Sequence, residues 1–137
     1  MRRSLALLGA LSLLLGCATI DPWGHQRSLE DAQRSYTQMV RWGDFLKASA
    51  FVDPELADGF LDDAESLSTV RFTDYEIGAL DMKDDKASAT VRVEYQAYHT
   101  ATLLEGTLRE TQDWYFEGGK WRVRPTLAAL SQSLLGP

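Results

Sequence analysis

The chain has 137 residues, of which 45% are hydrophobic and 25% charged, and it carries a formal net charge of −6. This length suits one folded domain, and the content of tryptophan and tyrosine is too high for a disordered chain. The negative charge argues against a nucleic-acid partner and against electrostatic binding to anionic lipid headgroups. The single cysteine excludes a disulfide within the chain.

The first part of the chain, residues 1–17, has the pattern of a secretion signal. Two arginines precede an apolar run from Leu5 to Leu15, which is too short to span a bilayer permanently and is typical of a signal peptide. The run ends in Leu14-Leu15-Gly16-Cys17, which resembles the lipobox of bacterial lipoproteins. The resemblance implies that residues 1–16 are removed as a signal peptide and that Cys17 is acylated.

The lipobox resemblance also implies a location. Acylation of both the sulfur and the new amino group of Cys17 would attach the chain to a membrane stably, because two lipid signals suffice for that. Ala18 follows Cys17, whereas an aspartate there usually marks inner-membrane retention in similar lipoproteins. We therefore expect the protein on the outer membrane, facing the periplasm. Residues 17–27 are expected to form the lipidated tether, and residues 28–137 the folded domain.

Helices are expected up to residue 68. Ser28 is predicted to cap the first helix, in which apolar side chains recur every three or four residues. Gly43 is expected to interrupt this helix before a second, short helix over residues 45–52. Asp53, followed by proline, is a strong start signal for a third helix over residues 54–66.

After residue 68 the apolar pattern changes to a period of two, which predicts an antiparallel sheet. The expected strands cover residues 70–82, 87–101, 108–116 and 121–124. The first strand changes phase near Asp74, which predicts a β-bulge there. Tight turns are expected at Asp84-Asp85 and Gly118-Gly119, and a short closing helix over residues 127–134.

The order of these elements resembles the NTF2-like superfamily, which includes ketosteroid isomerase and SnoaL-type cyclases. The most similar segment is residues 114–123, Trp-Tyr-Phe-Glu-Gly-Gly-Lys-Trp-Arg-Val, which is like the final hairpin of many such domains. The resemblance covers about residues 28–130. It implies an α+β fold in which N-terminal helices pack on a bent antiparallel four-stranded sheet and form a cone.

The resemblance also suggests where chemistry would occur. In enzymes of this superfamily an aspartate or histidine at the mouth of the cone moves a proton, and a tyrosine or a protonated aspartate stabilises the enolate. It therefore makes His99 a candidate catalytic base and places Tyr36, Tyr95 and His99 around a ligand. No Asp-His or Ser-His spacing supports catalysis. In the alternative, His99 ends a strand near solvent or bonds to a backbone carbonyl.

Basic side chains alternate with apolar neighbours along the predicted strands and indicate a basic face of the sheet: Arg92, Arg109, Lys120, Arg122 and Arg124. In one interpretation, carboxylates of Glu94, Glu110 and Asp113 neutralise this face across the strands. In the other, Arg109, Arg122 and Arg124 belong to a protein interface with Trp114 among its aromatic anchors.

Six carboxylates lie between Asp53 and Glu65 without one lysine or arginine. Calcium prefers oxygen ligands of this kind, but its sites arrange them around a loop with a sharp glycine turn. A solvated helix face near the positive end of the helix dipole is the preferred interpretation. We expect no metal site and no cofactor.

Three functions remain open. The first is a non-enzymatic, lipid-anchored module that binds an envelope protein, or a second copy of itself, at the outer membrane. The second is a binder of a small apolar ligand inside the cone, which predicts a cavity with a few polar groups. The third is an acid–base isomerase or cyclase with His99 as its base.

Overall fold

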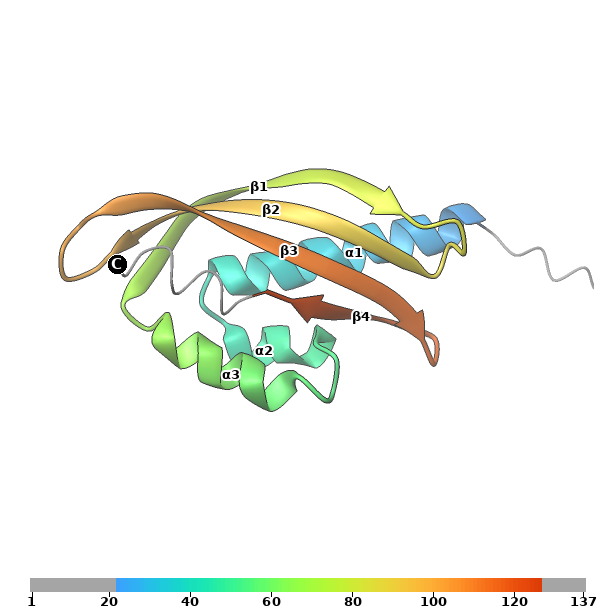
Figure 1. Cartoon of the computed structure of the whole chain (residues 1–137), viewed down its shortest axis with the longest axis horizontal. Helices are drawn as coiled ribbons and strands as arrows, with labels where there is room; N and C mark the ends of the chain where they lie inside the picture. The colour runs from blue at the N-terminus through green and yellow to red at the C-terminus, as the bar shows by residue number, and fades with distance from the viewer. Residues whose placement is uncertain (1–21, 127–137) are drawn as a thin grey trace, which may run out of the picture.

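The structure is a computed structural model that describes residues 22–126, so Cys17 and the predicted closing helix over residues 127–134 lie outside the described residues. The helices are α1 (Pro22–Arg41), α2 (Phe45–Ala48), the short 3-10 helix η1 (Ser49–Phe51) and α3 (Ala57–Ser66). The strands are β1 (Val70–Met82), β2 (Ser88–His99), β3 (Glu105–Glu117) and β4 (Lys120–Pro125). They form one curved antiparallel sheet in the order β1-β2-β3-β4 (Figure 1).

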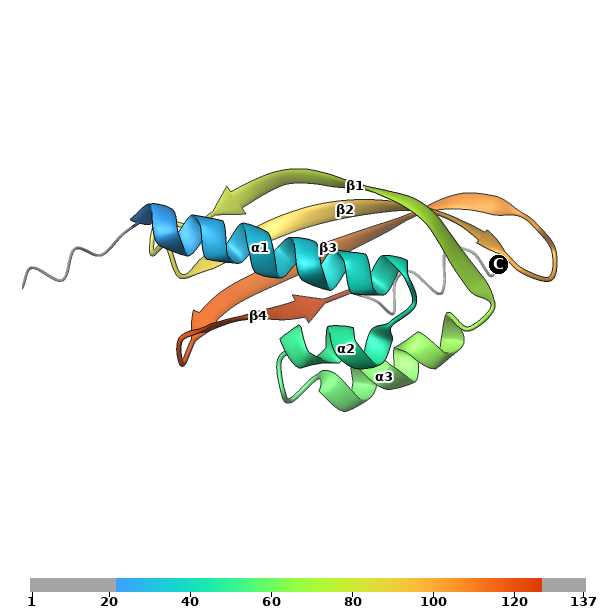
Figure 2. The same ribbon diagram turned by 180° about the vertical axis from the view of Figure 1, so that it is seen from behind.

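Helix α1 crosses the inner face of the sheet, and α2 and α3 lie beside β4 (Figure 2). Leu29, Tyr36 and Val40 recur along one side of α1 and are fully buried. They belong to the same core as Val93 of β2 and Leu108 of β3. The expected α+β architecture is confirmed, with helices on one face of a bent four-stranded sheet.

The predicted start of the first helix was wrong. The helix begins at Pro22, so residues 22–27, which were expected in the tether, are helical. Proline is well suited to the first helical turn because its missing N–H has no intrahelical partner there. The Ser28 hydroxyl donates to the carbonyl oxygen of His25 at 2.9 Å, one turn earlier. A serine that bonds back in this way lies inside a helix and does not cap it.

The register of β1 shifts twice. The shift between Phe72 and Asp74 confirms the predicted bulge, and Thr73 is its extra residue. A second shift, between Ile77 and Leu80, was not predicted. Gly78 lies within it, and a Cβ there would come within 3.0 Å of a backbone oxygen of β2. The glycine therefore permits a close backbone approach.

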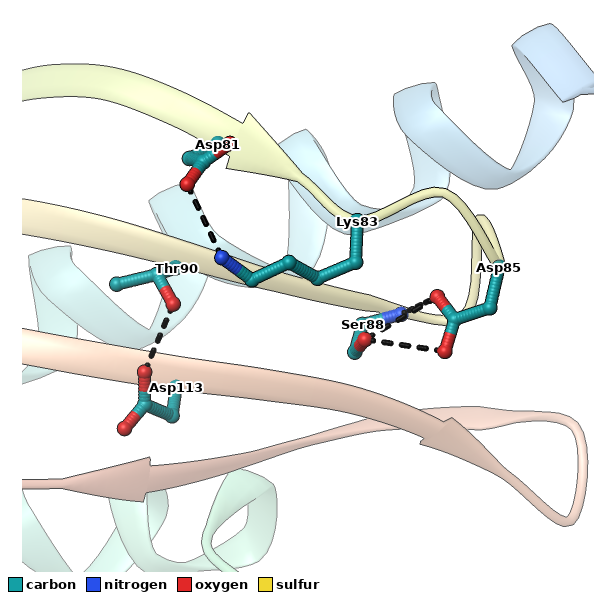
Figure 3. A network of polar contacts seen from close by, with 6 residues as sticks. All are labelled: Asp81, Lys83, Asp85, Ser88, Thr90 and Asp113. Atoms are coloured by element: carbon teal, nitrogen blue, oxygen red, sulfur yellow. Dashed lines mark hydrogen bonds and ion pairs between the residues drawn. The ribbon is translucent and has the colours of Figure 1, made fainter.

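Both predicted turns are present. Gly118 and Gly119, between β3 and β4, have φ angles of 59° and 78°, a backbone region in which glycine is favoured. Between β1 and β2, the Asp85 carboxylate accepts a hydrogen bond from the backbone N–H of Ala87 at 2.9 Å. It also accepts one from the backbone N–H of Ser88 at 3.1 Å (Figure 3). The third helix starts at Ala57 and not at residue 54, because residues 54–56 form a turn.

Replacement of Trp121 tests the final hairpin. The side chain is 6% exposed, its indole N–H donates to the Ser28 hydroxyl at 3.0 Å, and its ring centroid lies 5.3 Å from that of Phe116. Trp121→Ala should lower the free energy of unfolding by about 3–5 kcal/mol, because it leaves a cavity in the core. Urea denaturation measures the loss. The control is Trp42→Ala, at a tryptophan that is 76% exposed; it should change the free energy of unfolding by only about 0.5 kcal/mol. Equal losses in both variants would contradict the burial of Trp121 in the core.

Candidate functional site

A buried carboxylate lies at the centre of the inner face. Glu110 of β3 is 1% exposed. The Tyr36 hydroxyl of α1 donates to its Oε1 at 2.8 Å, and the Tyr95 hydroxyl of β2 donates to its Oε2 at 2.9 Å. The Gln112 amide donates to the same Oε2 at 2.8 Å. Side chains from one helix and two strands therefore meet on one carboxylate.

The Gln112 side chain extends this network toward α1. Its Oε1 accepts from Gln33 Nε2 at 3.1 Å and from Trp114 Nε1 at 3.2 Å, and its Nε2 also approaches the Thr37 hydroxyl at 3.1 Å. Among the described residues, no buried side-chain nitrogen or oxygen lacks a hydrogen-bond partner. Such fully satisfied polar networks are rigid, because each lost bond would leave a desolvated polar group unpaired.

Burial dominates the titration of this cluster. It raises the pKa of Glu110 above its ordinary value of 4.5, and the hydrogen bonds from Gln112, Tyr36 and Tyr95 oppose that rise. Burial, followed by the charge of Glu110, raises the pKa of Tyr36 and of Tyr95 well above 10.0. Both tyrosines therefore keep their protons at neutral pH and act as donors to Glu110.

The placement of Glu110 on the basic face of the sheet was wrong. The inner row of β3 consists of alternate residues, namely Leu108, Glu110, Gln112 and Trp114. The two polar residues interrupt the apolar pattern, so the alternation is hidden in the sequence. The available signal was the shared phase of Leu108 and Trp114, which places Glu110 on the buried side. The same phase makes Trp114 a core residue, so its prediction as an exposed interface anchor was wrong.

Tyr36 and Tyr95 come together, but His99 lies apart from them. It ends β2, and its Nδ1 accepts the backbone N–H groups of Ala101 and Thr102 at 3.2 and 3.4 Å. His99 thus holds the turn that follows β2. It ends a strand, as the alternative expected, but its ring accepts backbone N–H groups and, within the described residues, does not donate to a backbone carbonyl. Neither His99 nor Glu110 lines the cleft described below.

The outer face of the sheet is partly neutralised. Arg109 Nε lies 2.8 Å from the Glu94 carboxylate, which confirms one expected cross-strand pair. Asp113 instead accepts a hydrogen bond from the Thr90 hydroxyl of β2 at 2.9 Å (Figure 3). The expected pairing of Asp113 with an arginine was therefore wrong.

The two arginines of β4 contact the segment before α3. Arg124 Nε lies 2.9 Å from the Asp53 carboxylate, and Arg122 donates to the carbonyl oxygen of Ala50 at 3.0 Å. The hydrogen bond from Arg124 is the main cause that lowers the pKa of Asp53. These arginines join the sheet to the helical layer, although their side chains remain partly accessible.

An open cleft of about 910 Å³ lies where α1, α3 and the start of β1 converge. Figure 2 shows these three ends on the same side of the molecule. Buried Leu67, Val70 and Phe72 contribute its apolar lining, and half-buried Phe45 and Tyr98 add aromatic surface. No pattern in the sequence predicts this cleft.

Other classes of site find no support in the described part of the chain. Within residues 22–126 no group of histidine, cysteine, aspartate and glutamate side chains is arranged to hold a metal ion. No helix in the same range is long and apolar enough to cross a membrane.

Glu110→Gln tests the buried carboxylate. A group whose pKa is raised on folding contributes stability below its unfolded pKa that is lost as the pH rises through its folded pKa. Relative to Glu110→Gln, the unmodified protein should therefore lose stability as the pH rises above the ordinary value of 4.5. Urea denaturation of both proteins from about pH 4 to about pH 8 measures the difference. Parallel stability curves would show that Glu110 does not titrate differently on folding.

No protein-family model and no curated protein matches the sequence. Solved structures do match. A SEC-C motif-containing protein from Rhodopseudomonas palustris aligns with a TM-score of 0.57 and 18% identity, over 72% of this chain and 77% of that one. A scytalone dehydratase-like protein from Novosphingobium aromaticivorans aligns with a TM-score of 0.56 and 15% identity, over 74% of this chain and 80% of that one. A polyketide cyclase-like protein from Xanthomonas campestris pv. campestris aligns with a TM-score of 0.56 and 11% identity, over 79% of this chain and 99% of that one. The chain therefore has the NTF2-like fold, the cone of helices and bent sheet that the sequence resemblance predicted.

Proposed function

We propose that this protein is a lipid-anchored envelope lipoprotein whose NTF2-like domain binds a small apolar ligand without transforming it. The cleft at the end of α1 carries the proposal. Its volume of about 910 Å³ is near the upper end of the usual range for small-molecule sites. Its lining combines an apolar surface with a few polar groups, which is the usual composition of such sites.

Two features favour binding over catalysis. A general base must come within hydrogen-bond reach of the proton that it removes. Glu110 is 1% exposed, and both of its oxygens already accept hydrogen bonds. His99 is engaged with the turn after β2. A substrate would have to open the core or unmake that turn to use either group.

Protein binding remains a second candidate because of two exposed leucines. Leu103 and Leu104, in the turn between β2 and β3, are 70% and 66% exposed. Adjacent exposed apolar side chains of this kind can contribute to an interface. An envelope protein or a second copy of this chain would be the partner, with Arg109 on the neighbouring outer face of the sheet.

The ligand proposal is tested with neutral probes, the amides of octanoic and 2-naphthoic acid. The full chain in zwitterionic nanodiscs is titrated calorimetrically, with empty nanodiscs as the blank. At least one amide should bind, and Ser68→Trp should weaken its binding about tenfold or more, because Ser68 is exposed and lines the cleft. Ser66→Trp, an exposed position outside the lining, is the matched control. Binding of neither amide, or equal binding by both variants, would reject this use of the cleft.

The lipid anchor is tested separately. Residues 14–17 support acylation of Cys17, and Ala18 favours the outer membrane. Cys17→Ser should leave an unprocessed precursor without palmitate label, because the acylated sulfur is gone. Ser12→Ala, in the same apolar run, should be processed and labelled like the unmodified chain. Immunoblots and radiolabelled palmitate measure both results, and normal labelling of Cys17→Ser would contradict the lipobox.

A further inference from the structure

We infer that the cleft selects an amphipathic anion, with an apolar body and one oxyanion head held by Arg41 and Arg71. This inference rests on the proposed function and adds the chemistry of the ligand. The starting observation is a local inversion of charge. The chain carries a net charge of −6, yet the lining of the cleft contains two arginines and no aspartate or glutamate.

Arg41 is positioned by the bulge in β1. Thr73 is the extra residue of that bulge, so its carbonyl oxygen is left outside the regular ladder. An Nη2 N–H of Arg41 donates to this oxygen. The guanidinium carbon also lies 4.5 Å from the centroid of the Trp42 ring. The carbonyl and the ring orient the side chain, and most of its N–H donors have no acceptor among residues 22–126.

Arg71 is held in a similar way. Its Nη1 donates to the carbonyl oxygens of Ser68 and Val70 at 3.3 and 3.2 Å. Among the described residues, the ion pairs involve other basic side chains, and neither Arg41 nor Arg71 takes part in one. Neutral carbonyl groups orient a guanidinium but do not cancel its charge. Two uncompensated positive charges therefore border one cleft.

The apolar surface beside these charges defines the rest of the ligand. Val70 and Phe72 alternate with Arg71 along β1, and both are buried at the cleft. Trp42 is 76% exposed at its rim and offers an aromatic surface for a ligand body. Arginine is well suited to carboxylate and phosphate heads because its planar fork can donate two parallel hydrogen bonds. A ligand with a cationic head would find no carboxylate to pair with in this lining.

The test compares matched probes on the full chain in zwitterionic nanodiscs: 2-naphthoate, 2-naphthyl phosphate, 2-naphthamide and 2-naphthylmethylammonium. Calorimetric titration should show at least one of the two anions binding about tenfold more tightly than the amide, and the cation more weakly. The order of the two anions identifies the head group. Added salt should reduce the preference.

Variants locate the anion. Arg41→Gln and Arg71→Gln keep a polar side chain but remove the charge, and each should reduce the preference for the anion over the amide about fivefold to tenfold. Arg92→Gln, which removes one exposed charge from β2 outside the lining, should leave the preference intact. Thermal unfolding confirms that each variant is folded.

The outcomes separate this inference from the proposed function. If the amide binds as tightly as both anions, or if the preference survives in both cleft variants, the anion inference is wrong and ligand binding stands. If none of these four probes binds and the amide of octanoic acid does not bind either, both are wrong. If no probe binds, but Arg41→Gln and Arg71→Gln change the oligomeric state seen by sedimentation, the cleft is a contact between two copies of the chain. The inference is then overturned as well.

Discussion

The interaction on which the rest of the structure depends is the burial of Glu110 beneath α1. A carboxylate removed from water is tolerated only when hydrogen bonds replace its lost hydration. Here the donors are Tyr36 from α1, Tyr95 from β2 and Gln112 from β3. The requirement that all of them reach one group sets how α1 lies across the sheet. Apolar packing alone is less directional and would constrain the helix less.

Closure of the interior has a consequence for function. The interior between α1 and the sheet is occupied in this protein by the hydroxyl and amide groups around Glu110. The accessible cleft lies instead at the end of α1, where Arg41 and Trp42 follow the last buried turn of the helix. Binding at this end requires no opening of the core. The polar cluster thus acts as a structural element, and the cleft offers the accessible chemistry.

Four arginines of the domain, Arg41, Arg71, Arg109 and Arg124, differ in the group that accepts their hydrogen bonds. Arg109 and Arg124 pair with carboxylates, and these pairs join neighbouring strands or connect the sheet with the helical layer. Arg41 and Arg71 are oriented by backbone carbonyl oxygens. A carboxylate partner removes most of the field of an arginine, whereas a carbonyl leaves it. This difference separates structural arginines from those that can hold an anion.

By itself the sequence determined the class of the fold and the order of its elements. The period of the apolar residues changes after residue 68, and that change alone separates helices from strands. The glycines at 118 and 119 and the phase change near Asp74 were sufficient for a turn and a bulge, because these features depend on a few adjacent residues. The start of α1 was missed because serine is a common capping residue, whereas here the Ser28 hydroxyl donates to a carbonyl oxygen of its own helix.

Only the tertiary structure decided which polar residues face inward. The buried row of β3 carries Glu110 and Gln112. The shared phase of Leu108 and Trp114 was its only trace in the sequence, and the partners that satisfy these polar groups on α1 and β2 are set by packing. The cleft was equally beyond the sequence, since α2, η1 and α3 separate Arg41 from Arg71 in the chain, and the two residues line one cleft only through the convergence of α1 with β1. Local patterns determine elements because their causes are local. Sites are assembled from distant residues, so their chemistry is set by packing.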